Sequence, residues 1–178
     1  MTSLDRDEYQ HLISHALIQQ DWHKAHDISL ESLLYFKDDG ELQYIQGSIC
    51  AHLKQFDEAV HWLSKGIATG LDSLYPAAFQ LGLIHLTSGN NEKAHDAWEV
   101  LNELAVNHYF YLFSQGMTQL VSNEFEKAQF NIEKGLSLND DFPSINNDME
   151  IALARINAIL GQDQILDSHY QKNNLADN

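Results

Sequence analysis

Hydrophobic side chains recur at helical spacing along most of the chain, and short polar stretches interrupt them at regular intervals. Residues 41–53 form one such segment, a break of three residues follows, and residues 57–68 form the next. This spacing of apolar positions predicts amphipathic helices. Similar breaks lie at 19–22, 88–91 and 122–125. Because each break is short, the helices on either side of it are expected to lie antiparallel.

Small residues repeat with a period of 34 or 35. The alanines of this pattern are Ala25, Ala59, Ala94 and Ala128, and the glycines are Gly47, Gly82 and Gly116. Each glycine precedes its alanine by 12 residues, and Ile13 takes the glycine's place in the first segment. Twelve residues lead down one helix and back up the next, so we expect glycine and alanine to face each other. Glycine inside a helix costs about 1 kcal/mol relative to alanine, so its repetition indicates close packing.

Aromatic residues stand at three of the four turns, namely Trp22, Phe56 and Phe125, while the third turn carries Asn91. Together with the glycines and alanines, they give a pattern over residues 6–142 that resembles the tetratricopeptide repeat family. The unit of that family is a helix–turn–helix of 34 residues. Its usual tryptophan near the start of the first helix is missing here, and its closing proline is absent or displaced. The resemblance implies an all-α fold, a right-handed α–α superhelix of about nine helices.

The repeat spacing predicts one domain over residues 1–178, with four helical pairs followed by a further helix. The expected units are 6–39, 40–73, 75–108 and 109–142. A capping helix is expected over 144–160, because apolar residues recur there at helical spacing, as Ile145, Met149, Ala152 and Ile156. Asp57 and Ser144 are the expected caps of their helices. Residues 161–178 are expected to form a flexible tail.

Composition narrows the classes of partner. The chain has 26 acidic and 10 basic side chains, and its formal charge of −16 disfavours nucleic acid and anionic membrane surfaces. No run of about 18 apolar residues predicts a membrane span. The polar N-terminus and the single cysteine, Cys50, predict a cytoplasmic protein without a disulfide. A bacterial source belongs to the leading hypothesis given below.

In the tetratricopeptide family the first helix of each pair usually lines a concave face. The resemblance and the helical phase together predict a partner-binding groove, formed by Tyr44, Ser48, Phe79, Leu83, Phe110, Phe113 and Met117. Its apolar C-terminal half suits an apolar or amphipathic segment of another protein, and the acidic rim suits basic flanks. The alternative is that some of these side chains pack against the next repeat or the last helix, as apolar stripes usually do.

Candidate chemistry is sparse. His11 and His15 share a helix face, but no histidine pair falls in a metal-binding frame. His85 is expected to be partly buried, at a position where the family prefers tyrosine. Cys50 is interpreted as a small buried hydrophobe. We therefore expect no catalytic residue, no cofactor and no metal.

These observations favour a protein–protein interaction scaffold or adaptor that is not an enzyme. A secretion-type chaperone is a sharper version of this hypothesis, suggested by architecture and charge. A homodimer with no other ligand is an alternative, and a metal protein or enzyme based on histidine is the third.

Overall fold

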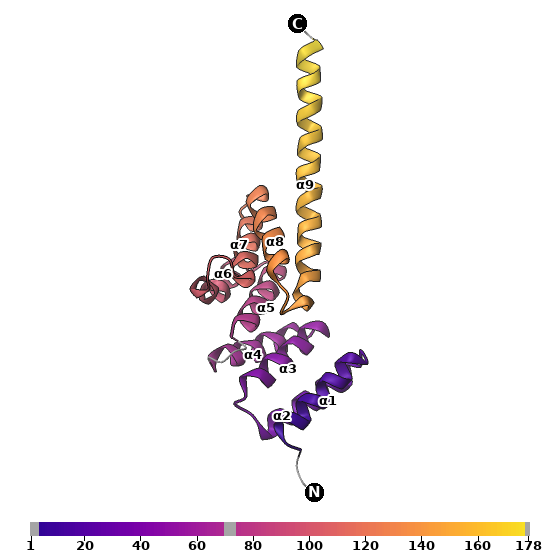
Figure 1. Ribbon diagram of the computed structural model, residues 1–178, viewed down its shortest axis with the longest axis vertical. Helices are drawn as coiled ribbons and strands as arrows, with labels where there is room; N and C mark the ends of the chain where they lie inside the picture. Colours follow the sequence, from indigo (N-terminus) through magenta and orange to yellow (C-terminus); the bar gives the residue numbers. More distant parts are fainter. Residues whose placement is uncertain (1–3, 70–73, 177–178) are drawn as a thin grey trace. The chain divides into compact units, whose positions relative to one another are not determined.

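A computed structural model describes residues 4–69 and 74–176, with side chains as far as residue 161. Over these residues it contains nine α-helices, one short 3-10 helix and no strand, as the sequence predicts (Figure 1). The elements are α1 (Arg6–Ile18), α2 (Trp22–Tyr35), α3 (Gly40–His52), α4 (Phe56–Ala68), α5 (Leu74–Thr87), α6 (Asn91–Trp98), η1 (Glu99–Glu103), α7 (Tyr109–Val121), α8 (Phe125–Leu138) and α9 (Pro143–Ala176).

The chain forms two compact units, Met1–Leu101 and Asn102–Asn178. In the first unit, α1 pairs with α2, α3 with α4 and α5 with α6, and successive pairs stack through α2 on α3 and α4 on α5. In the second unit α7 pairs with α8, and α9 packs against α8. Every expected repeat thus holds one helical pair. The assignment of all residues to a single domain stays a prediction.

The turn inside each pair has the same backbone geometry four times. A residue with positive φ ends each first helix: Gln20 (57°), Lys54 (60°), Gly89 (77°) and Asn123 (58°). The next backbone N–H reaches back five residues, as from Asp21 to the carbonyl of Ala16 at 2.9 Å. This pattern is a Schellman motif, which satisfies carbonyl groups left open at a helix end. It reverses the chain within a few residues and so makes the two helices antiparallel.

Glycine brings the two helices of a pair together at three points. A Cβ atom added to Gly47 would lie 2.7 Å from Leu63 Cγ, and one added to Gly82 would lie 2.0 Å from Trp98 Nε1. At Gly116 the same atom would lie 2.7 Å from Ile132 Cγ1. The expectation that glycine serves close packing is therefore confirmed. The nearest side chain at each glycine is that of the large residue four positions after the alanine, one helical turn further along. The expected contact with the alanine itself is present at Gly116, where the added atom would lie 3.3 Å from the Ala128 carbonyl oxygen.

The first repeat reverses this pairing of small and large residues. Ile13 occupies the position of the glycines, and Ser29 occupies the position that holds Leu63, Trp98 and Ile132 in the other repeats. Both residues are buried. The larger residue therefore lies on the first helix of this pair and the smaller one on the second.

The last helix covers α8 through Met149, Ala152 and Ile156, which are buried as expected for a capping helix. It continues to Ala176, whereas the sequence pattern predicts its end at 160. Gly161 does not stop it: a Cβ atom there would meet nothing within 4 Å, and glycine inside a helix costs only about 1 kcal/mol. Figure 1 shows α9 running past the α7–α8 pair as one helix.

Candidate functional site

The predicted groove residues lie on three first helices. Tyr44 and Ser48 are on α3, Phe79 and Leu83 on α5, and Phe110, Phe113 and Met117 on α7. Tyr44, Ser48 and Leu83 are partly exposed, whereas the other four are at most 7% exposed. The partly exposed three all belong to the first unit. Only they present side-chain atoms to which a partner has ready access.

Local packing explains the burial of Phe79 and Phe113. The Phe113 ring lies over Gly135 of α8, where an added Cβ atom would be 2.5 Å from Phe113 Cε1. The Phe79 ring stacks on Trp98 with centroids 6.1 Å apart, and Trp98 Nε1 donates a hydrogen bond of 3.0 Å to the Phe79 carbonyl. Packing inside the repeat accounts for both aromatic rings, whereas the alternative expectation placed such side chains against the next repeat or the last helix.

The exposed part of the predicted groove joins α3 to α5 through polar groups. Ser48 Oγ donates a hydrogen bond of 2.6 Å to Gln80 Oε1. Burial raises the pKa of Tyr44, and a hydrogen bond with Ser48 opposes this rise. Leu83 stands three residues after Gln80 on α5, so the two side chains share one side of this helix. The α3–α5 face, meaning Tyr44, Ser48, Gln80 and Leu83, therefore combines apolar surface with groups that form hydrogen bonds.

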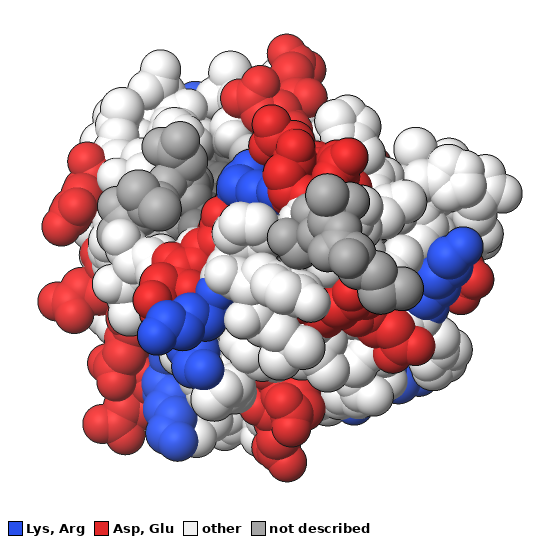
Figure 2. Space-filling view, turned by 90° about the horizontal axis from the view of Figure 1, so that it is seen from below, with Lys and Arg blue, Asp and Glu red and all other residues white. Residues whose placement is uncertain are grey.

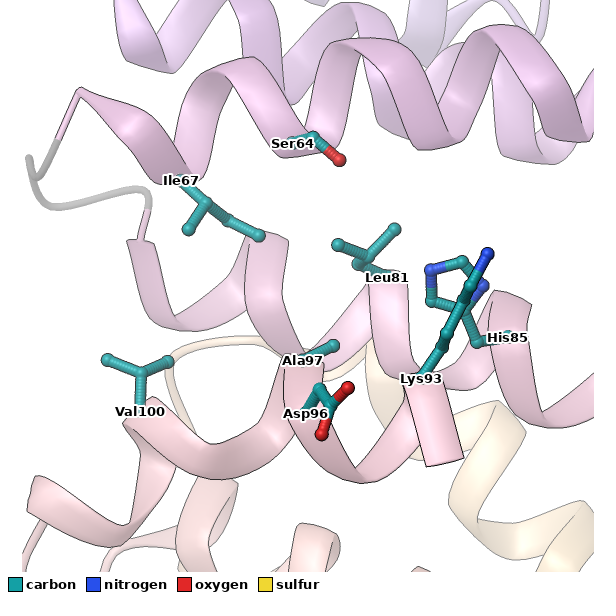
Figure 3. A pocket seen from close by; sticks show the side chains of 8 residues that line it. All are labelled: Ser64, Ile67, Leu81, His85, Lys93, Asp96, Ala97 and Val100. Carbon is teal, nitrogen blue, oxygen red and sulfur yellow. The ribbon is translucent and has the colours of Figure 1, made fainter. Parts of the chain in front are cut away.

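A second hollow, which the sequence did not predict, is lined by residues of α4, α5, α6 and η1. Its volume is about 370 Å³. Figure 3 shows the side chains around it, with Leu81 and Ala97 in the middle and His85 beside Lys93 at one end. The lining residues are Ser64, Ile67, Leu81, His85, Lys93, Asp96, Ala97 and Val100. We call this hollow the α4–α6 pocket.

His85 is partly buried, as expected, and forms one end of the α4–α6 pocket. Burial lowers the pKa of His85, and the positive charge of Lys93 lowers it further. At neutral pH the imidazole is therefore uncharged and acts as a hydrogen-bonding group, while Lys93 supplies the positive charge.

Cys50, His11 and His15 are the other side chains singled out for their reactivity. Cys50 is buried, and burial together with Glu58 raises the pKa of its thiol to about 11. The thiol is protonated at neutral pH, so the interpretation of Cys50 as a buried hydrophobe is confirmed. His11 and His15 are exposed. In the described residues no group of three or more His, Cys, Asp or Glu side chains is placed to hold a metal ion.

Acidic side chains outnumber basic ones by 26 to 10 in the chain. Figure 2 shows many Asp and Glu side chains and only scattered Lys and Arg on the face seen there. Such a surface attracts positively charged partners and disfavours polyanions. Among the described helices, none combines the length and the apolar character that crossing a membrane requires.

The turns, the glycine contacts and the stacked antiparallel pairs define a tetratricopeptide-type helical-repeat fold. Solved structures with this arrangement include MamA, with a TM-score of 0.61 and 18% identity over 78% of this chain and 80% of that one. MamA from Desulfovibrio magneticus RS-1 gives a TM-score of 0.63 and 18% identity over 92% of this chain and 90% of that one. YrrB, described as a TPR protein with an unusual peptide-binding site, gives 0.58 and 20% identity over 75% and 69%.

At these identities the similarity shows the fold. No family model matches the chain. No curated protein matches it either.

Proposed function

We propose that this protein is an interaction scaffold whose α3–α5 face binds an apolar or amphipathic segment of another protein. The observation that carries this proposal is the pairing of partly exposed Tyr44 and Leu83 with the Ser48–Gln80 hydrogen bond on two neighbouring first helices. Apolar atoms supply burial energy, and the hydroxyl and amide groups fix the orientation of a bound segment. YrrB, which shares the fold and has a peptide-binding site, adds support by similarity.

Phe79, Phe110, Phe113 and Met117 have a different role in this proposal. Because they are buried, they fix the spacing and tilt of the helices instead of contacting the partner at first encounter. Replacing one of these phenylalanines with alanine would remove a core ring, at a cost of about 3–5 kcal/mol in stability. Loss of binding in such a variant would report unfolding as well as contact, so surface residues provide the better test.

The acidic surface sets the expected chemistry of the partner. With 26 acidic and 10 basic side chains, the protein attracts segments with basic flanks over distances of about 10 Å at ordinary ionic strength. We infer a partner segment with apolar residues at helical spacing and lysine or arginine at its ends. A cytoplasmic location and a chaperone-like role in holding such a segment belong to the same proposal.

The test compares two leucine variants on different faces. Leu83→Gln changes the α3–α5 face, whereas Leu34→Gln changes the outer face of α2, where Leu34 is 77% exposed. We expect proteins captured from native lysate by the wild type to be lost with Leu83→Gln and retained with Leu34→Gln. Circular dichroism establishes that both variants remain helical. Equal retention by both variants would contradict the assignment of the face.

Self-association is the second candidate function, and one observation favours it. Leu30 and Leu34 are exposed one turn apart on α2, at 41% and 77%. Light scattering at several concentrations separates the two functions. If the wild type is a dimer and Leu34→Gln is a monomer, self-association is supported. If both are monomers, the scaffold is supported.

A further inference from the structure

We propose that the α4–α6 pocket binds an aromatic side chain, a tryptophan above all, from a partner protein. The pocket lies between second helices of adjacent repeats, so it is a different surface from the α3–α5 face and goes beyond the function proposed for that face. Four observations support the inference: the register of the repeats, the lining of the pocket, its charges, and a contact of the same kind elsewhere in the molecule.

The register of the repeats shows which side chain the pocket lacks. Trp62 stands three residues after Ala59, and Ala97 stands three residues after Ala94, so the two occupy the same position in successive repeats. Trp62 on α4 is partly buried and packs against two clusters of buried residues, one drawn from α1, α2 and α3 and the other from α3, α4 and α5. The protein's own indole ring therefore covers apolar side chains at this repeat position. In the next repeat the corresponding residue is a single methyl group.

The lining of the pocket suits a flat apolar ring. Leu81 and Ala97 form its middle, and Ile67 and Val100 close the end opposite His85 (Figure 3). A volume of about 370 Å³ lies in the range of sites for ligands of modest size. A tryptophan side chain offers about 150–250 Å² of surface for burial, mostly apolar, with one N–H group that needs an acceptor.

The charges at the pocket complement an indole. Asp96 lines the pocket and offers carboxylate oxygens, which can accept a hydrogen bond from the indole N–H. Lys93 brings an ammonium group, and among the described residues no carboxylate lies within 4.0 Å of it. An ammonium group within about 6 Å of a ring centroid is attracted to the π face. Neutral His85 adds a further flat surface beside Lys93.

The molecule already makes this kind of contact once. Lys65 Nζ lies 4.6 Å from the ring centroid of Trp62, and His61 meets the same ring edge to face. The combination of tryptophan, lysine and histidine therefore occurs already on α4, in the preceding repeat. In the α4–α6 pocket the lysine and the histidine are present, and the partner supplies the ring.

The test uses N-acetyl-L-tryptophanamide as the probe and N-acetyl-L-leucinamide as its matched control. We expect the tryptophan probe to shift the methyl resonances of Ile67, Leu81 and Ala97 at millimolar concentration, and the leucine probe to shift them far less. Lys93→Gln combined with Asp96→Asn should weaken the tryptophan probe about tenfold by removing both polar contacts. Equal shifts with both probes, or no effect of the double change, would overturn the proposal.

A filling variant gives an independent measurement. Ala97→Trp should place an indole in the pocket, because Ala97 occupies the repeat position of Trp62. It should raise the melting temperature and abolish the probe's effect on Ile67 and Leu81. Ala154→Trp on the exposed face of α9 is the control and should do neither. A folded Ala97→Trp variant that still binds the probe would show that the pocket is not the site.

The same variant distinguishes a partner protein from a second copy. Light scattering measures the oligomeric state of the wild type and of Ala97→Trp. A dimeric wild type with a monomeric Ala97→Trp variant would assign the pocket to self-association and overturn the choice of occupant. Because the probe titration needs no partner, a negative result leaves the proposal for the α3–α5 face standing.

Discussion

The two helices of a pair approach each other closely because three glycines have no Cβ atom. Gly47, Gly82 and Gly116 each present bare backbone to a large side chain of the partner helix. The most severe case is Gly82, because Trp98 is held both by stacking on Phe79 and by a hydrogen bond to the Phe79 carbonyl. Trp98 therefore cannot yield to a new methyl group without losing these contacts.

Gly82→Ala is expected to lower the free energy of unfolding by about 2–3 kcal/mol, despite alanine's higher helix propensity, because overpacking outweighs it. Urea denaturation measures the change. Trp98→Leu in the same background should recover part of the loss, since it makes the position resemble Leu63 of the preceding repeat.

Gly161→Ala is the matched control for the substitution at Gly82. An added Cβ atom at Gly161 meets nothing within 4 Å, so propensity alone acts and stability should rise by about 0.5–1 kcal/mol. Similar losses at Gly82 and Gly161 would show that packing against Trp98 is not the cause.

The turn is the element that all four repeats share most closely. Its positive φ falls on Gln20, Lys54, Gly89 and Asn123, and only one of these is glycine. The left-handed region is costly for residues with a Cβ atom, by about 1–2 kcal/mol for ordinary residues. Two of the turns therefore hold a long polar residue in an unfavourable conformation, which the hydrogen bonds of the Schellman motif offset.

Gln20→Gly and Lys54→Gly are each expected to raise the free energy of unfolding by about 0.5–1 kcal/mol, because glycine adopts positive φ without a steric penalty. Thermal denaturation followed by circular dichroism measures the gain. The neighbouring Gln19→Gly is the control: φ there is −76°, so glycine should lower stability. A loss in all three variants would contradict this account of the turn.

Element boundaries show what sequence patterns can predict. The helical pairs and their antiparallel order follow from short breaks and a fixed period, because those depend on local spacing. The caps are wrong: Asp57 lies inside the first turn of α4, whose N-cap is Gln55, and Ser144 lies inside α9. At α4 the position of the cap depends on where the Schellman turn before it ends, which one sequence window does not determine. At α9 the helix begins at Pro143, one residue before Ser144.

Side-chain accessibility was harder to predict than helix position. Helical phase gives the direction of Phe113 relative to its own helix, but its burial depends on Gly135 of α8 lying beneath the ring. The α4–α6 pocket has a signal in the sequence, since Ala97 stands where Trp62 stands one repeat earlier. That signal becomes meaningful only when Trp62 is seen to pack its ring against the core of the repeats.

At the scale of the whole molecule, charge and protonation determine how stability responds to pH. His85 and His108 both have a pKa lowered by burial, and in His108 the charge of Asp141 opposes the effect. The folded state therefore takes up these protons less readily than the unfolded state, whose histidines titrate near 6.5. The contribution of each neutral histidine is fully present above that value and is lost as pH falls through the folded pKa.

Wild-type stability should therefore decrease below about pH 6.5, and His85→Gln should reduce that decrease, because glutamine takes up no proton. Urea denaturation between pH 8 and pH 5 measures both slopes. Protonation of the many carboxylates affects the two proteins equally, so the difference between them isolates His85. Parallel curves over the whole range would show that His85 titrates alike in both states.

The reversed pair Ile13 and Ser29 has a consequence for how the array can vary. Each hairpin has one small and one large residue at these two positions, and in the first hairpin the large residue is on the first helix instead of the second. A chimera that joins α1 to the second helix of a later hairpin would combine two large residues, and one that joins a later first helix to α2 would combine glycine with serine. Shuffling, whether in the laboratory or over generations, therefore has the whole hairpin as its natural unit, with the crossover points falling in the loops between hairpins.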